Sequence, residues 1–132
     1  MCWEPPRETG VLALNRWLMA AAILGAVGVS LGALGAHALP TRLSTEQLAS
    51  WDTAVRYHLL HSVALLALAL FATESGQSIQ LPGWLFSLGI VLFSGSIYLL
   101  LLTDQRWLGP MTPLGGLLLI AGWLSLFALA RG

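Results

Sequence analysis

The chain has 132 residues, of which 57 % are apolar and only 9 % are charged, and its formal net charge is zero. A soluble domain carries roughly a quarter charged residues, because it needs a hydrated surface. With a mean hydropathy of +0.79, six arginines and no lysine, this chain is expected in lipid. The composition excludes a soluble globular enzyme, a disordered tail and a nucleic-acid binder, which would show an excess of basic residues.

Four stretches without Asp, Glu or Arg are long enough, or nearly so, to cross the hydrocarbon core, which takes about 20 apolar residues. We expect helices near residues 17–38, 44–73, 82–103 and 112–130, because backbone groups in lipid must be satisfied within their own segment. The predicted fold class is an all-α integral membrane protein, a four-transmembrane-helix bundle with short loops. The domain prediction is a flexible N-terminal leader, residues 1–16, and one four-helix membrane domain, residues 17–132.

The second helix is expected to begin before its membrane span does. Ser44 and Gln47 have the spacing of a capping box, which marks a helix start. Asp52 and Arg56 are four residues apart, a spacing that suits an ion pair along one helix face. We interpret residues 44–56 as an interfacial or extended first section of this helix.

The first span has a rival interpretation as a secretory signal. Arg7 and Arg16 precede an apolar run that ends in a possible cleavage site at residues 36–38. The run is longer than the usual signal core, so we expect it to stay in the mature protein. Three arginines fall on each side of the membrane, and assigning Arg56 to the helix rather than to a loop favours cytoplasmic termini.

Small residues recur at helical spacing on the first and fourth helices, where they let helix backbones approach closely in lipid. The predicted helix-packing residues are Gly25, Gly28, Gly32, Gly35, Gly115 and Gly122. A second stripe on the first helix consists of Ala22, Ala26, Ser30, Ala33 and His37. We expect most of this packing within the chain. With only four helices, however, some stripes are left for self-association or for another membrane protein.

Polar side chains are few at membrane depth, and alternating helices are expected to bring them to one membrane face. The predicted polar cluster consists of His37, Tyr57, His61, Ser94, Ser96, Tyr98 and Thr112. His58 lies beside it on the second helix. Ionisable groups inside a membrane are costly and usually turn inward or find a partner.

Three chemical roles compete with a structural one for this cluster. His37 and His61 could be axial haem ligands or part of a metal site, or histidines and tyrosines could relay protons or line a small-molecule pocket. Ser94 or Ser96 with His61 would lack the intramembrane acid of a hydrolytic site. We expect instead an interhelical hydrogen-bond cluster, each bond worth about 1 kcal/mol or less. No catalytic residue, metal ligand or cofactor is assigned, and the single cysteine, Cys2, excludes a disulfide within one chain.

Four ordered motifs carry a family resemblance. They are Gly32-Ala33-Leu34-Gly35-Ala36-His37, Tyr57-x-x-x-His61, residues 92–98 (LFSGSIY), and residues 112–116 (TPLGG) with residues 121–123 (AGW). Over about residues 17–130 the chain resembles the domain-of-unknown-function 423 family, small four-span proteins of bacterial inner membranes that include transmembrane protein 256 of animals. The resemblance implies four helices, an inner-membrane location and the same polar positions, with His58 outside the motif. It implies no reaction, substrate or cofactor.

We therefore expect a small multi-pass inner-membrane protein that is not an enzyme. Its expected role is that of an accessory or packing subunit of a larger membrane assembly or of its own oligomer. Its expected partners are the lipid bilayer and a membrane protein, and no nucleic acid. The alternative is a His/Tyr-lined membrane site that binds haem, metal, quinone or lipid, or that relays protons.

Overall fold

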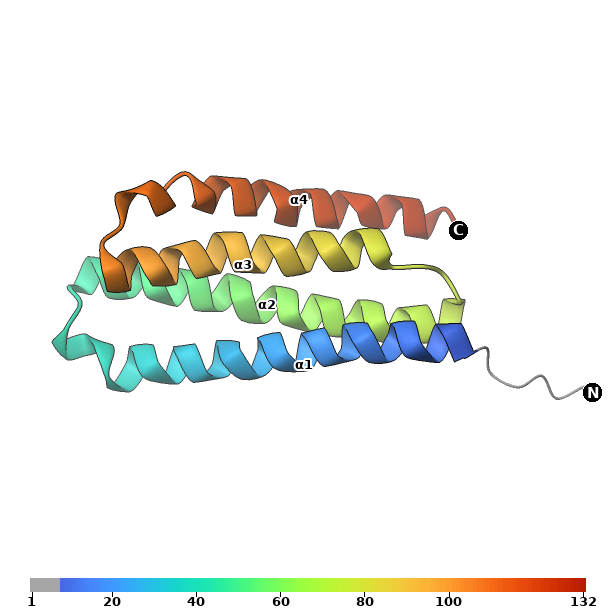
Figure 1. The fold of residues 1–132 in the computed structure, drawn as a ribbon, viewed down its shortest axis with the longest axis horizontal. Helices are drawn as coiled ribbons and strands as arrows, with labels where there is room; N and C mark the ends of the chain where they lie inside the picture. Colours follow the sequence, from blue (N-terminus) through green and yellow to red (C-terminus); the bar gives the residue numbers. More distant parts are fainter. Residues whose placement is uncertain (1–7) are drawn as a thin grey trace, which may run out of the picture.

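The computed structural model describes the backbone of residues 8–132 and the side chains from Arg16 onward. These residues form four long helices joined by short connections (Figure 1). α1 spans Glu8–His37, α2 Thr45–Ser75, α3 Gln80–Thr103 and α4 Met111–Ala130, with single 3-10 turns at Leu39–Thr41 and Arg106–Leu108. Each long helix is apolar enough to cross a membrane. The predicted fold class, a four-transmembrane-helix bundle with short loops, is confirmed.

The helix ends lie within two residues of the predicted ones, except at the start of α1. This helix begins at Glu8 and so includes residues 8–16 of the predicted leader, whereas residues 1–7 lie outside the described residues. No glycine or proline interrupts the sequence from Val11 to Leu24, so nothing in it stops a helix from extending beyond the apolar span. The candidate membrane span within α1 is Arg16–His37.

Local signals set the ends of α2 and α3. The backbone N–H of Gln47 donates to Ser44 Oγ (3.2 Å) and the backbone N–H of Ser44 donates to Gln47 Oε1 (2.9 Å), which confirms the predicted capping box. α2 ends at Gly76, whose φ of 69° is a left-handed conformation that favours glycine. α3 ends at Asp104, which adopts the same region with a φ of 56°.

The helices pack in chain order, so that α2 and α3 form the centre of the bundle while α1 and α4 lie at its edges (Figure 1). In the most apolar stretch of each helix, 44 % of the residues are buried in α2 and 33 % in α3, but only 11 % in α1 and 17 % in α4. The outer helices therefore keep most of their surface for lipid or for another protein.

Two hydrogen bonds fix how α1 and α2 are aligned along their length. Trp51 Nε1 donates to the backbone oxygen of Leu31 (2.9 Å), and His58 Nε2 lies 2.7 Å from the backbone oxygen of Leu24. Since the two helices are antiparallel, this stretch of α2 runs beside the middle of the α1 span, Arg16–His37.

A third hydrogen bond aligns α2 with α3. Ser94 Oγ donates to the backbone oxygen of Ala54 (2.7 Å), and Ser94 lies close to the midpoint of α3. The section of α2 around Ala54 is therefore flanked on two sides by the middle of an apolar span. These contacts favour a deeper position for this section than the interfacial one predicted for residues 44–56.

Candidate functional site

The predicted polar cluster does not assemble into one site. His37 is exposed at the end of α1. The alignment of α1 with α2 places His37 at the same height as Thr45. Thr45 is sixteen residues before His61, a separation of about 24 Å along a helix that rises 1.5 Å per residue. His37 and His61 therefore cannot ligate one haem or one metal ion in this fold. The prediction placed residues 44–56 at the membrane interface, whereas α2 packs beside α1 from its first turns.

The first of three separate polar contacts is centred on His58, where α1, α2 and α3 meet. Its Nε2 lies 2.7 Å from the backbone oxygen of Leu24, and its Nδ1 lies 3.1 Å from the hydroxyl of Tyr98. A carbonyl oxygen can only accept, so Nε2 carries the proton and Nδ1 accepts from the Tyr98 hydroxyl. Both nitrogens are satisfied by a neutral imidazole. His58, which the family motif leaves out, is thus the buried histidine that connects three helices.

Trp51 and Ser94 extend this contact along α2. The Trp51 indole is buried and packs against the Tyr98 ring, with 4.7 Å between ring centroids. Ser94, also buried, uses its hydroxyl on the backbone of α2 as described above. Aromatic packing and side-chain donors to backbone oxygens therefore hold α1, α2 and α3 together in this region.

The second polar contact joins α2 to α4 through His61. His61 Nδ1 donates to the backbone oxygen of Tyr57 (2.7 Å), and Trp123 Nε1 donates to His61 Nε2 (3.0 Å). Because an indole N–H can only donate, Nε2 of this imidazole is the unprotonated nitrogen. The ring of His61 also packs against Phe86, with 5.6 Å between centroids. Tyr57 is exposed and lies against Phe93, with 4.8 Å between centroids.

The third polar contact joins α3 to the first turn of α4. The hydroxyls of Ser96 and Thr112 are 2.6 Å apart, and Ser96 Oγ also donates to the backbone oxygen of Phe93 (2.9 Å). Since Ser96 has one hydroxyl proton, Thr112 is the donor between the two side chains. The predicted cluster is therefore three interhelical contacts and two residues with exposed side chains, His37 and Tyr57, of which Tyr57 contributes only its backbone oxygen.

Glycines on α1 explain how side chains of α2 reach the backbone of α1. A helical side chain covers the turn on its N-terminal side and so hides the carbonyl four residues earlier. Gly28 and Gly35 stand four residues after Leu24 and Leu31, the two carbonyl acceptors. A Cβ at Gly35 would lie 2.6 Å from Cδ1 of Trp51. These glycines expose the acceptors and leave room for the donors.

Glycines at the boundary of α3 and α4 have a different effect. A Cβ at Gly115 would overlap the backbone of Leu92 and Phe93, so the two helix backbones touch at this point. A Cβ at Gly122 would lie 2.8 Å from the ring of Phe86. On α1, by contrast, a Cβ at Gly25 would meet no atom within 4 Å.

The predicted packing glycines thus divide into two groups. Those that contact another helix are Gly28, Gly32, Gly35, Gly115 and Gly122. Gly25 faces open space. The interhelical contacts that the sequence analysis did not predict are made by Trp51, His58 and Trp123. One signal was available: Trp51 and His58 are seven residues apart, and so are Gly28 and Gly35.

Comparisons with known proteins identify relatives. The chain matches the family model described as "Protein of unknown function (DUF423)" over residues 31–116. It is 44 % identical over 108 residues to the UPF0382 membrane protein SH2409 of Staphylococcus haemolyticus, covering 79 % of this chain and 88 % of that protein. It is 43 % identical over 114 residues to the UPF0382 membrane protein YwdK of Bacillus subtilis, covering 82 % and 93 %. No solved structure matches the chain.

Proposed function

We propose that this chain, which belongs to the DUF423 family and is an integral membrane protein, acts as a non-enzymatic packing subunit. It would serve a larger membrane assembly or its own oligomer, in the bacterial inner membrane, with both termini in the cytoplasm. The proposal assigns no cofactor and no catalytic residue. Its partners are the lipid bilayer and a membrane protein.

The outer surface of α1 is the observation that carries this proposal. The small-residue stripe on this helix is exposed at every position, Ala22, Ala26, Ser30, Ala33 and His37. Small residues on a lipid-facing surface offer little area to acyl chains, but they let another helix approach closely. The stripe is therefore better suited to protein packing than to lipid contact.

The use of the buried polar groups also supports a structural role. His58 and His61 each have both ring nitrogens engaged in hydrogen bonds. The hydroxyls of Ser94 and Ser96 bond to backbone oxygens and, for Ser96, to Thr112, rather than to either histidine. A hydrolytic site needs a nucleophile bonded to its base, and a haem or metal site needs a free imidazole nitrogen. Neither alternative therefore gains support from these contacts.

Native mass determination tests the proposed function. The tagged chain is extracted into nanodiscs or mild detergent, and every protein that co-elutes is identified and weighed. We expect a complex of defined stoichiometry, either with other membrane subunits or among copies of the chain. A monomer at every protein concentration tested, or a stoichiometric bound haem or metal, would contradict the proposal.

A further inference from the structure

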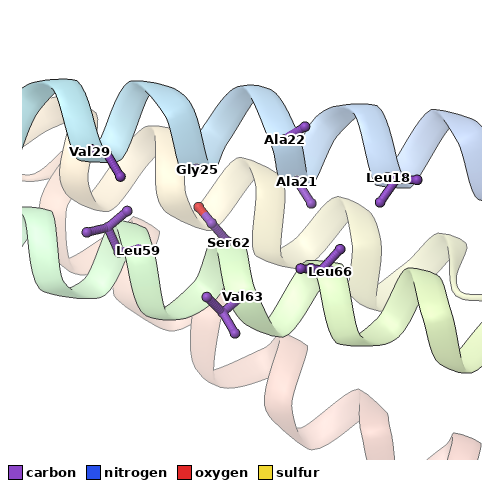
Figure 2. Close-up of a pocket in the computed structure, with 9 residues that line it drawn as sticks. All are labelled: Leu18, Ala21, Ala22, Gly25, Val29, Leu59, Ser62, Val63 and Leu66. Atoms are coloured by element: carbon purple, nitrogen blue, oxygen red, sulfur yellow. The ribbon is translucent and has the colours of Figure 1, made fainter.

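An apolar groove runs along the boundary of α1 and α2 on the outer face of the bundle. One hollow in it has a volume of about 350 Å³ and lies between Gly25 and Val29 of α1 and Leu59, Ser62 and Val63 of α2 (Figure 2). Because a Cβ at Gly25 would meet no atom within 4 Å, none of the side chains described from Arg16 onward fills the groove at that position.

A second hollow continues the groove toward the connection between α1 and α2. It has a volume of about 240 Å³, and it is lined by Gly32 and Ala36 of α1 and by Asp52 and Val55 of α2. The lining positions on α1 follow a helical repeat of three and four residues, as expected for one face of a helix: Ala22, Gly25, Val29, Gly32 and Ala36.

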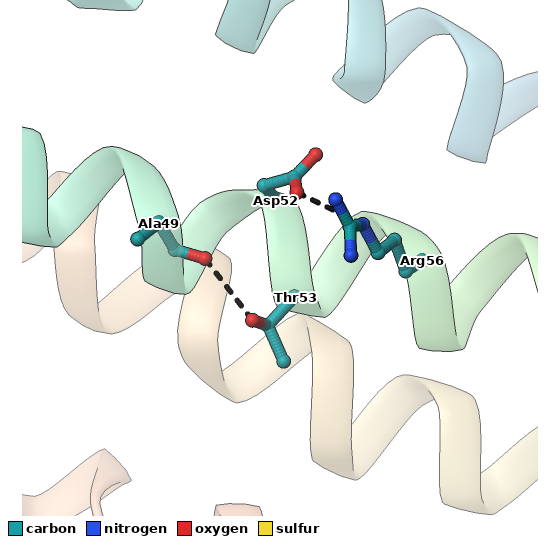
Figure 3. Close-up of polar contacts among 4 residues, drawn as sticks. All are labelled: Ala49, Asp52, Thr53 and Arg56. Carbon is teal, nitrogen blue, oxygen red and sulfur yellow. Dashed lines mark hydrogen bonds and ion pairs between the residues drawn. The ribbon is translucent and has the colours of Figure 1, made fainter.

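The predicted ion pair between Asp52 and Arg56 is present beside this groove. Arg56 Nε lies 2.9 Å from Asp52 Oδ2, and the two side chains are 79 % and 60 % exposed, Arg56 being the more exposed. Figure 3 shows the pair on the side of α2 that borders α1, whereas Thr53 points toward α3 and donates to the backbone oxygen of Ala49 (3.1 Å). Since both side chains are mostly exposed, both charges lie at the outer surface of the bundle, beside the boundary of α1 and α2.

The ion pair also lies far from the end of the α1 span, measured along the helices. By the alignment of the two helices, Asp52 lies level with a residue of α1 seven positions before His37, and Arg56 with one eleven positions before it. At 1.5 Å per residue these depths are about 10 and 16 Å below the end of the α1 span. Charged side chains at such depth are costly unless a partner covers them. Lipid phosphates lie at the membrane surface, above the depth of this ion pair, and so do not cover it.

Resting on the proposed function, we propose that a second copy of this chain covers the α1–α2 face. A twofold axis along the membrane normal places the same two side chains of the partner at the same depth. Each Arg56 then lies beside the partner's Asp52, and the two ion pairs form one four-charge network shielded from lipid. Gly25 and its neighbours in the groove admit the partner's helix. An unrelated partner would need matching charges at that depth, which a second copy has by construction.

Charge reversal tests the pairing directly. Two copies with different tags are co-expressed, extracted into nanodiscs and purified through one tag, and the amount of the other copy is measured. Asp52→Arg in both copies, or Arg56→Asp in both, places like charges together and should reduce co-purification by about tenfold. One copy with Asp52→Arg and one with Arg56→Asp should restore it. Failure of the mixed pair to restore association would overturn the proposal.

A second variant keeps the test independent of membrane insertion. Gly25→Leu extends a side chain into the groove from a position where a Cβ would meet no described atom within 4 Å, so it should leave the melting temperature of the monomer unchanged and abolish co-purification. Gly95→Leu is the matched control, since a Cβ at Gly95 also meets nothing and Gly95 lies on α3, away from the groove. It should leave both readouts unchanged. Undiminished co-purification with Gly25→Leu would overturn the proposal.

The outcomes separate this inference from the proposed function. A complex with other membrane subunits that contains a single copy of the chain would overturn the inference and leave the proposed function standing. A monomer without any partner would overturn both. Retention of an anionic phospholipid by a monomer, lost in Arg56→Gln, would assign the face to lipid and overturn the inference.

Discussion

The boundaries of α1 with α2 and of α3 with α4 both rest on glycines, but the glycines do different things. Between α1 and α2, Gly28 and Gly35 uncover carbonyl oxygens that receive His58 and Trp51. Between α3 and α4, Gly115 lets one backbone lie directly on the other. Similar small-residue patterns therefore produce either a hydrogen-bonded contact or a backbone contact, and the side chains on the opposite helix decide which.

The largest effect is expected where the backbones touch. Gly115→Ala places a methyl group on the backbone of Leu92 and Phe93, which cannot rotate away as a side chain can. We expect the free energy of unfolding to fall by about 3 kcal/mol, measured by titration with a denaturing detergent. Gly116→Ala is the control, because its Cβ would lie at an ordinary 3.7 Å from the Phe93 ring. Equal stabilities of the two variants would contradict the backbone contact.

A smaller loss is expected at the hydrogen-bonded boundary. His58→Phe removes both ring hydrogen bonds and leaves the buried Tyr98 hydroxyl without its acceptor. We expect a loss of about 2 kcal/mol in the same titration. His58→Gln, which can still donate and accept, should lose less. If both variants were equally unstable, packing rather than hydrogen bonding would explain the role of His58.

Coupling between a glycine and its donor gives a finer measure of the same boundary. Gly35→Ala and Trp51→Phe should each disturb the bond from the indole to Leu31. Once one change has removed this bond, the other has less left to disturb. A double-mutant cycle should therefore find the double variant about 1 kcal/mol more stable than the sum of the single losses predicts. Additive losses would argue against an acceptor exposed by glycine.

The smallest effect is expected at His37, which lies in the same family motif as Gly32 and Gly35. It is exposed at the end of α1. We expect His37→Ala to change the free energy of unfolding by no more than about 0.5 kcal/mol. A loss comparable to that of His58→Phe would show that His37 has a structural contact.

The fold was predictable because each element depends on local signals. Apolar run length set the four spans, the spacing of Ser44 and Gln47 set the start of α2, and four-residue spacing set the ion pair of Asp52 and Arg56. The polar cluster was not predictable in the same way. Its assembly depends on which residues of two neighbouring helices lie at the same height. That height depends on how much of α2 packs beside α1, which only the packed pair of helices determines.

Local pattern also could not rank the histidines. His37, His58 and His61 are all possible site residues when each is judged by its own neighbours in the sequence. Only the positions of distant partners, Leu24 and Tyr98 for His58 and Trp123 for His61, show which imidazoles are buried and bonded. The family motif includes the exposed His37 and omits the buried His58.

The equal spacing of donors and acceptors restricts how α1 can move against α2. Trp51 and His58 are seven residues apart, and so are Leu31 and Leu24. Sliding one helix by a single turn would break both bonds and form neither anew, and only a slide of seven residues, about 10 Å, would realign one donor with one acceptor. The pair therefore resists piston motion.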